Sequence, residues 1–266
     1  FFISIFVGLS FCYLGFKHSK SISLIDQLIF IVLSFFFIPL LLSIPYFFSM
    51  YGISLINSYF ESVSGFTATG FSIIQDVNSI NQPLLLWRSS SQWLGGFLFL
   101  LVTIGTIGSK QIKIKPSYLI SGGASGRNFY YNFNYNFIKI LAIYLVSTIS
   151  IIILYSLVDI RLLDSFNLAF TVISSGGFIP DNQLSNIVGE NLQIFVLSIT
   201  LFLPILNFFL IFDLVTRQFR FKNNYEDFHL IILITSISFL LYFFLIPDQG
   251  FINTFFSVTS AISTSG

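Results

Sequence analysis

Charged side chains are scarce in this chain: 9% of its 266 residues are Asp, Glu, Lys or Arg, and 55% are hydrophobic. A soluble domain of this size needs far more polar surface. The net charge of +1 does not provide the strongly basic surface that nucleic acid binding requires. Apolar runs of about 20 residues, long enough to cross a bilayer, recur along the chain. We therefore expect an integral membrane protein with several crossings.

Cysteine is also scarce, since Cys12 is the only one. A single cysteine cannot form a disulfide within the chain, and we interpret Cys12 as a packing residue in its apolar run. The two histidines, His18 and His229, lack the neighbouring ligands of a metal site. The sequence contains no nucleophile motif, metal-ligand cluster or phosphate-binding loop. We therefore expect neither an enzyme nor a bound cofactor.

Apolar residues are gathered in segments of two lengths. The long ones, which we expect to span the membrane, are Leu24–Phe48, Leu84–Gly108, Phe137–Val158, Leu192–Leu214 and His229–Ile246, preceded by the end of an earlier helix at Phe1–Phe16. The short ones are Ile53–Phe66, Leu162–Ile173 and Phe251–Ile262. Segments of that length fit re-entrant helices, which enter the membrane and return on the same side.

Basic residues predict the orientation, because Lys and Arg favour the cytoplasmic side of short loops. If only the long segments cross, ten of the twelve Lys and Arg residues share one side, and Arg88 and Arg161 lie on the other. We therefore predict that the short segments enter from outside. The long polar connection Ser109–Asn136 contains the basic cluster Lys110–Lys115. This cluster either serves only to orient the chain in the membrane or docks a cytosolic regulator.

The three short segments are copies of one motif that align without gaps. Each opens with Asn or Asp followed by Ser or Thr, which is a helix N-cap signal. About three turns of apolar helix follow. The copies end in Thr67-Ala68-Thr69-Gly70, Ser174-Ser175-Gly176-Gly177 and Ser263-Thr264-Ser265-Gly266. A single ending of this kind would indicate tight helix packing, but three copies in register favour a shared function.

Endings rich in small hydroxyl residues and glycine suit the binding of a dehydrated cation. Backbone carbonyls replace the hydration shell of an ion when the loop is extended and its side chains are small. Glycine permits unusual dihedral angles and a close approach of the backbone. A short helix that stops at the loop points its negative end toward the cation. We therefore predict that the four residues of each ending form a selectivity filter.

These motifs resemble those of a known family, the Trk/Ktr/HKT potassium transporters, and especially its TrkH type. The stretch from Val63 to Gly70 is similar to the first filter segment of that family, and the endings at 174–178 and 263–266 resemble the second and third. Leu86-Trp87-Arg88, followed by Gln92-Trp93-Leu94-Gly95-Gly96, resembles the start of the next helix and is the most specific part of the match. The resemblance covers nearly the whole chain.

The resemblance implies an all-α polytopic membrane protein in which helix–pore-helix–filter-loop–helix units surround a pseudo-fourfold pore. Residues 1–23 would end a preceding helix pair, 24–108 would form pore repeat 1, 109–136 a cytoplasmic loop, 137–215 pore repeat 2, and 216–266 a second cytoplasmic loop with an incomplete repeat 3. The resemblance also implies potassium uptake, a homodimer among the lipids of the cell inner membrane, and a cytosolic nucleotide-binding regulator of the TrkA or KtrA type.

Other interpretations remain open at this point. Because the chain starts at Phe1 inside an apolar run and stops at Gly266 inside the repeated motif, we expect a fragment with about three of four repeats. A non-conducting remnant of a split or degraded transporter gene is one alternative, and a Na⁺-permeable relative is another. A membrane enzyme or scaffold is a third, but no intramembrane acid–base pair supports it.

Two features near the second span also have open interpretations. Arg88 either acts electrostatically near the pore mouth or pairs with Glu61 or Asp76. Trp87 and Trp93 fit an interfacial aromatic belt.

Overall fold

The computed structural model describes residues 8–10, 13–14, 24–49, 53–107, 133–206, 225–244 and 250–265. Several predicted features lie outside these ranges: Cys12, His18, Gly266 of the third ending, and most of the basic residues of the predicted cytoplasmic side. Within the described ranges every regular element is a helix or a short 3-10 turn, as the sequence predicts. The chain is an all-α polytopic membrane protein.

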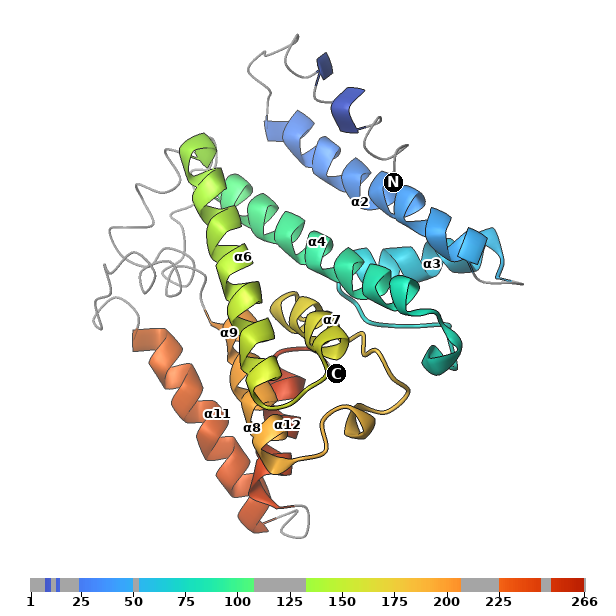
Figure 1. Cartoon of the computed structure of the whole chain (residues 1–266). Coiled ribbons are helices and arrows are strands. Elements are labelled where there is room, and N and C mark those ends of the chain that lie inside the picture. Colours follow the sequence, from blue (N-terminus) through green and yellow to red (C-terminus); the bar gives the residue numbers. More distant parts are fainter. Residues whose placement is uncertain are drawn as a thin grey trace. The chain divides into compact units, whose positions relative to one another are not determined.

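The described helices include long ones and short ones (Figure 1). The long ones are α2 (Leu24–Ser49), α4 (Gln82–Ile107), α6 (Phe133–Leu157) and α11 (Tyr225–Phe244). The short ones are α3 (Leu55–Phe66), α7 (Leu162–Ile173) and α12 (Phe251–Ile262), each of 12 residues. The short helices coincide with the three short apolar segments of the sequence, and their re-entrant topology stays a prediction.

Among the described helices, three are long and apolar enough to cross a membrane, over Leu28–Ser49, Phe137–Leu157 and Asp227–Phe244. The helix α4 is as long as α2, at 26 residues, but its first half is polar. Its side chains Arg88, Ser89, Ser91 and Gln92 are nevertheless buried. The polar groups of α4 therefore face protein, where hydrogen bonds can satisfy them.

The predicted span from Leu192 is interrupted. Its first part is α8 (Asn191–Thr200), and α9 (Phe202–Ile205) follows after a turn at Leu201. Pro204 explains the interruption, because it has no N–H to donate and its ring collides with the carbonyl four residues earlier, at Thr200. The helix therefore changes its geometry just before Pro204.

The chain divides into two compact units, Phe1–Val63 and Ser64–Gly266. In the first unit, the hydroxyl of Tyr59 on α3 donates a hydrogen bond of 3.2 Å to the carbonyl of Phe36 on α2. Many large apolar side chains of α2 are exposed, among them Phe30 and Phe48. Exposure of that kind is expected for a helix that faces lipid.

The second unit contains the same packing arrangement twice. The span before a short helix packs on it, as α6 does on α7 and α11 on α12. The second span of the preceding repeat packs on the same short helix, as α4 does on α7 and α8 on α12 (Figure 1). Each of these short helices therefore lies between the spans of two successive repeats, which is the arrangement expected when repeats follow one another around a ring.

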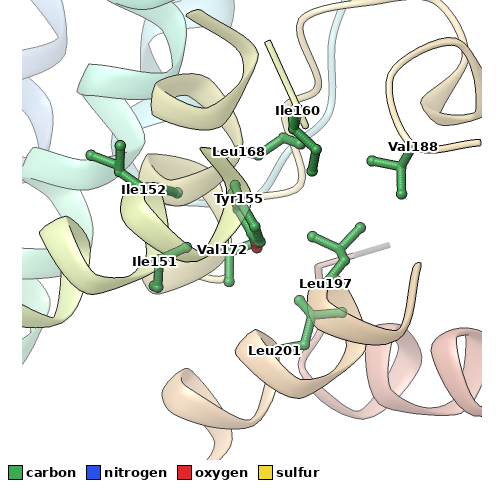
Figure 2. Close-up of a cluster of buried hydrophobic side chains, with 10 residues drawn as sticks. Ile151, Ile152, Tyr155, Ile160, Leu168, Val172, Val188, Leu197 and Leu201 are labelled. Carbon is green, nitrogen blue, oxygen red and sulfur yellow. The ribbon is translucent and has the colours of Figure 1, made fainter. Parts of the chain in front are cut away.

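The main hydrophobic core surrounds α7. Figure 2 shows side chains of α6, α7 and α8 converging on one another, together with residues of the loops that join them. The labelled residues are Ile151, Ile152, Tyr155, Ile160, Leu168, Val172, Val188, Leu197 and Leu201. A smaller cluster of Ile234, Phe255 and Val258 joins α11 to α12 in the same way. Burial of these apolar side chains fixes α7 and α12 and therefore the loop that follows each of them.

Candidate functional site

Each short helix ends in the same backbone turn. The second residue of each ending is left-handed, with φ of 53° at Ala68, 56° at Ser175 and 58° at Thr264. Its N–H bonds to the carbonyl three positions back, and the next N–H bonds to the carbonyl five positions back. This pair of hydrogen bonds is the Schellman motif. The alignment of the three endings in the sequence therefore extends to their dihedral angles and hydrogen bonds.

The start of the short helices differs from the prediction. Arg161 and Gly250 occupy the N-cap positions of α7 and α12, and neither makes a capping bond through its side chain. The Asn or Asp and the Ser or Thr that follow lie inside the first turn. There Ser58 and Thr254 donate their hydroxyls to the carbonyl four residues earlier. The N-cap prediction was wrong because Ser and Thr satisfy their hydroxyls equally well within a helical turn.

The three endings meet edge to edge. A Cβ on Gly70 would lie 2.5 Å from the carbonyl oxygen of Gly176, and a Cβ on Gly177 would lie 2.6 Å from that of Ser265. Both glycines also have positive φ, 81° and 76°. Only a residue without a Cβ fits this combination of distance and dihedral angle. The last residue of one ending therefore contacts the third residue of the next, in the order of the repeats.

The side chains differ among the three endings. In the first, the hydroxyls of Thr67 and Thr69 hydrogen-bond to each other at 2.6 Å. In the third, the hydroxyls of Ser263 and Ser265 form the same pair. The second ending has glycine at its third position, Gly176, so this pair cannot form there.

A glutamine from another repeat occupies the corresponding space. The Nε2 of Gln92, on α4, donates a hydrogen bond to the carbonyl of Gly176. Its Oε1 accepts from the Thr171 hydroxyl at 2.6 Å and from the N–H of Phe178 at 3.4 Å. Gln92 is fully buried. Sequence reasoning placed Gln92 in a specific motif but gave it no role. The glycine at the third position of only one ending was the signal that could have found it.

The remaining residues of the Gln92–Gly96 motif hold α4 against its neighbours. The indole N–H of Trp93 donates to the hydroxyl of Thr148 at 3.0 Å, and the hydroxyl of Tyr144 donates to the carbonyl of Trp93 at 3.0 Å. Both partners are on α6. Trp93 therefore joins two helices, a contact that its predicted place in an aromatic belt did not include.

The two glycines of the motif allow α4 to approach the ends of two short helices. A Cβ on Gly95 would lie 1.7 Å from the carbonyl oxygen of Phe66, the last residue of α3. A Cβ on Gly96 would lie 2.7 Å from the Cβ of Ser174, the first residue of the second ending. Any side chain at Gly95 would therefore displace the start of the first ending.

Arg88 contacts residues that follow the first two endings. It is 3% exposed. Its Nη2 donates to the hydroxyl of Ser72 at 3.1 Å, and its guanidinium carbon lies 4.3 Å from the centre of the Phe178 ring. A cation above an aromatic face is attracted to it. These contacts give Arg88 a structural role, because they join the two segments that leave the first and second endings. The predicted pairing with Glu61 or Asp76 stays a prediction.

The loops beyond the first two endings are joined by Asn182. Its Oδ1 accepts from the N–H of Val77 at 2.7 Å, and its Nδ2 donates to the carboxylate of Asp76 at 2.8 Å. Val77 and Asp76 follow the first ending, whereas Asn182 follows the second. The contact therefore continues the edge-to-edge arrangement of the two endings into their loops.

Two further carboxylates of this region are hydrogen-bonded. Asp181 accepts from the N–H of Gln183 and from the amide of Asn186, and these bonds hold the pKa of Asp181 below its ordinary value. Asp164 forms an ion pair with Arg161 at 2.9 Å at the start of α7. Asp181 therefore keeps its negative charge at neutral pH, on the side of the endings that the sequence predicts to be external.

The fold and the repeated helix–turn units define a membrane protein assembled from successive pore-type repeats. Among solved structures, the crystal structure of the potassium transporter TrkH from Vibrio parahaemolyticus matches with a TM-score of 0.74 and 19% identity, covering 99% of this chain and 56% of that one. No family model matches the chain. The chain nevertheless has the TrkH fold, as its resemblance to the Trk/Ktr/HKT family implies.

Curated relatives agree with this match. The chain is 29% identical over 244 residues to an uncharacterised cation transporter of Methanocaldococcus jannaschii, covering 86% of this chain and 46% of that protein. It is 23% identical over 225 residues to the Trk system potassium uptake protein TrkH of Halomonas elongata, covering 79% and 46%. It is 38% identical over 74 residues to TrkI of the same organism, covering 28% and 14%. The chain thus spans about half the length of the cation transporter and of TrkH, the two relatives that match most of this chain.

Proposed function

We propose that the chain forms part of the pore of a potassium uptake system in the cytoplasmic (inner) membrane. The ion is coordinated by backbone carbonyls of residues 67–70, 174–177 and 263–266, of which Gly266 lies outside the described residues. The observation that carries this proposal is the contact of successive endings, in which Gly70 and Gly177 close on the carbonyl oxygens of Gly176 and Ser265.

The physical argument starts from the cost of placing an ion inside a membrane protein. An alkali cation that sheds its water needs oxygen ligands, and peptide carbonyls supply them without a competing proton. Three turns with the same strained dihedral angles, each after a helix whose negative end points at the turn, offer such ligands. Backbone of irregular geometry is otherwise expensive at membrane depth, because its polar groups lose water.

The printed names of the relatives support the same class of function, since they describe a cation transporter and potassium uptake proteins. We extend potassium to this chain as part of the proposal, on the strength of these names. Carbonyl sites for K⁺ and Na⁺ differ only in fine geometry, so the choice of ion needs a direct test. From the same resemblance we propose a homodimer and a cytosolic regulator of the TrkA or KtrA type.

The test is an ion-flux assay on the full-length gene product in liposomes, with K⁺, Rb⁺ and Na⁺ compared in separate experiments. We expect K⁺ and Rb⁺ to enter faster than Na⁺. Equal or faster entry of Na⁺ would instead support a Na⁺-permeable relative. Absence of flux for all three ions would support a non-conducting remnant.

The filter itself is tested by Gly177→Asp. A side chain at this position meets the Ser265 carbonyl and requires a left-handed residue, and a carboxylate beside the ion path adds a charge. We expect flux to be abolished. Gly189→Asp is the matched control, because Gly189 lies in an exposed loop with its nearest neighbour at 3.7 Å. If Gly177→Asp transports K⁺ as well as Gly189→Asp does, the assignment of the filter is wrong.

A further inference from the structure

The second ending differs from the other two in how its third residue is held. Thr69 and Ser265 occupy this position in the first and third endings, and each pairs with the hydroxyl two residues earlier. Gly176 occupies it in the second ending. There Ser174 bonds instead to the carbonyl of Phe170, at 2.8 Å, within its own helix. The second ending therefore lacks the hydroxyl pair that its copies have.

The backbone does not require glycine at position 176. Its φ lies outside the left-handed range that favours glycine, unlike that of Gly177. Threonine and serine occupy the equivalent positions of the other copies. A Cβ at Gly176 would, however, lie 2.3 to 2.6 Å from the carboxamide atoms of Gln92. Glycine is therefore needed at this position to make room for the Gln92 side chain.

The carboxamide of Gln92 holds the peptide that connects two endings. Nε2 donates to the carbonyl of Gly176, and this same oxygen is the atom on which Gly70 of the first ending closes. Oε1 fixes the orientation of the amide through Thr171 and Phe178, on either side of the second ending. Loss of the amide would free the Gly176 peptide to rotate and would change its distance from the first ending.

We propose that Gln92 is a positioning residue that sets the ion selectivity of the filter by holding the Gly176 peptide, in place of the hydroxyl pair of the other repeats. This inference rests on the proposed function, because selectivity is a property of the conducting protein. It goes beyond that function, since it assigns the geometry of one filter segment to a side chain from a different repeat.

The test exchanges one means of support for the other. Gln92→Ala removes the amide, and Gly176→Ser introduces a hydroxyl that collides with Gln92 while it is present. We expect each single variant to lower the ratio of K⁺ to Na⁺ flux by roughly tenfold, the equivalent of one buried hydrogen bond. We expect the double variant to recover most of the ratio, because the new hydroxyl can pair with Ser174 as in the first and third endings.

The control is Gln193→Ala. Gln193 is also a buried glutamine that bonds to backbone, donating to the carbonyl of Val158 and accepting from the N–H groups of Gly189 and Glu190. It belongs to the start of α8 and contacts none of the three endings through these bonds. Gln193→Ala removes buried hydrogen bonds without touching the endings. We therefore expect it to lower the thermal midpoint and to keep the ratio of K⁺ to Na⁺ flux within about twofold of the unchanged protein.

Three results separate the possibilities. If Gln92→Ala keeps the flux ratio of the unchanged protein, Gln92 does not set selectivity and the inference is wrong. If the two single variants and the double variant show additive losses, the exchange of amide for hydroxyl is wrong. If the unchanged protein conducts no cation, the proposed function fails, and the thermal midpoints of the same variants still decide whether Gln92 and Gly176 are coupled.

Discussion

At the scale of single residues, the left-handed positions of the endings store strain. Ala68, Ser175 and Thr264 all have φ between 53° and 58°, and a left-handed conformation costs a residue with a Cβ about 1 kcal/mol. Glycine is the usual residue at this point of a Schellman motif. None of the three copies has glycine at this left-handed position, which is typical of strain retained at a functional site.

We predict that Ser175→Gly stabilises the protein slightly. Relief of the left-handed strain exceeds the extra freedom of glycine in the unfolded chain, so we expect a gain of up to about 1 kcal/mol. Thermal unfolding in detergent measures it. Ser174→Gly is the control, since Ser174 has φ of −96° and its hydroxyl bonds to Phe170. A midpoint lowered equally by both changes would contradict the assignment of strain to Ser175.

The residues of the candidate site could be proposed from the sequence, whereas the contacts between them could not. The small residues of the endings stand out because they recur in register. Gln92 and Gly176 are 84 positions apart, and no spacing rule relates a residue of one repeat to the filter of the next. The partner of Gln92 depends on how α4 packs on α7, which only the assembled repeats determine.

At the scale of elements, the short helices were predictable to the residue at their C-terminal ends. The predicted segments Leu162–Ile173 and Phe251–Ile262 are α7 and α12, and Ile53–Phe66 differs from α3 only at its start. The C-terminal ends are sharp because small residues follow an apolar run. The predicted N-cap residues were wrong at the N-terminal ends, because Ser and Thr side chains bond to the backbone both at a cap and inside a helical turn.

The close approach of α4 to the short helices gives a prediction for Gly95. We expect Gly95→Ala to destabilise the protein by about 1–3 kcal/mol, because its Cβ would overlap the carbonyl of Phe66 and push α4 away. Thermal unfolding in detergent and K⁺ flux should both decline. Leu94→Ala is the control, since Leu94 is an exposed neighbour on the same helix. Equal midpoints for the two variants would mean that α4 and α3 do not need this approach.

At the scale of the whole molecule, orientation follows from charge rather than from the fold. The helices could be inserted either way by their length and apolarity. The basic residues that break the symmetry are mostly in the connections 108–132 and 207–224, which lie outside the described residues. The predicted orientation places the endings on the external side, together with Asp76 and Asp181 in the loops that follow them. Negative charge there raises the local concentration of cations.

Labelling of single cysteines tests this orientation. In a background from which Cys12 and any other cysteine of the full-length protein have been removed, we expect Ser185→Cys to react with a membrane-impermeant maleimide added to intact cells. Ser185 is exposed in the loop that follows the second ending. Lys113→Cys, in the predicted cytoplasmic connection, should react only after the cells are permeabilised. The reverse pattern would turn the endings toward the cytoplasm. Reaction of both cysteines in intact cells would mean that the short segment Leu162–Ile173, the only short segment between the two positions, crosses the membrane, and its re-entrant topology would be wrong.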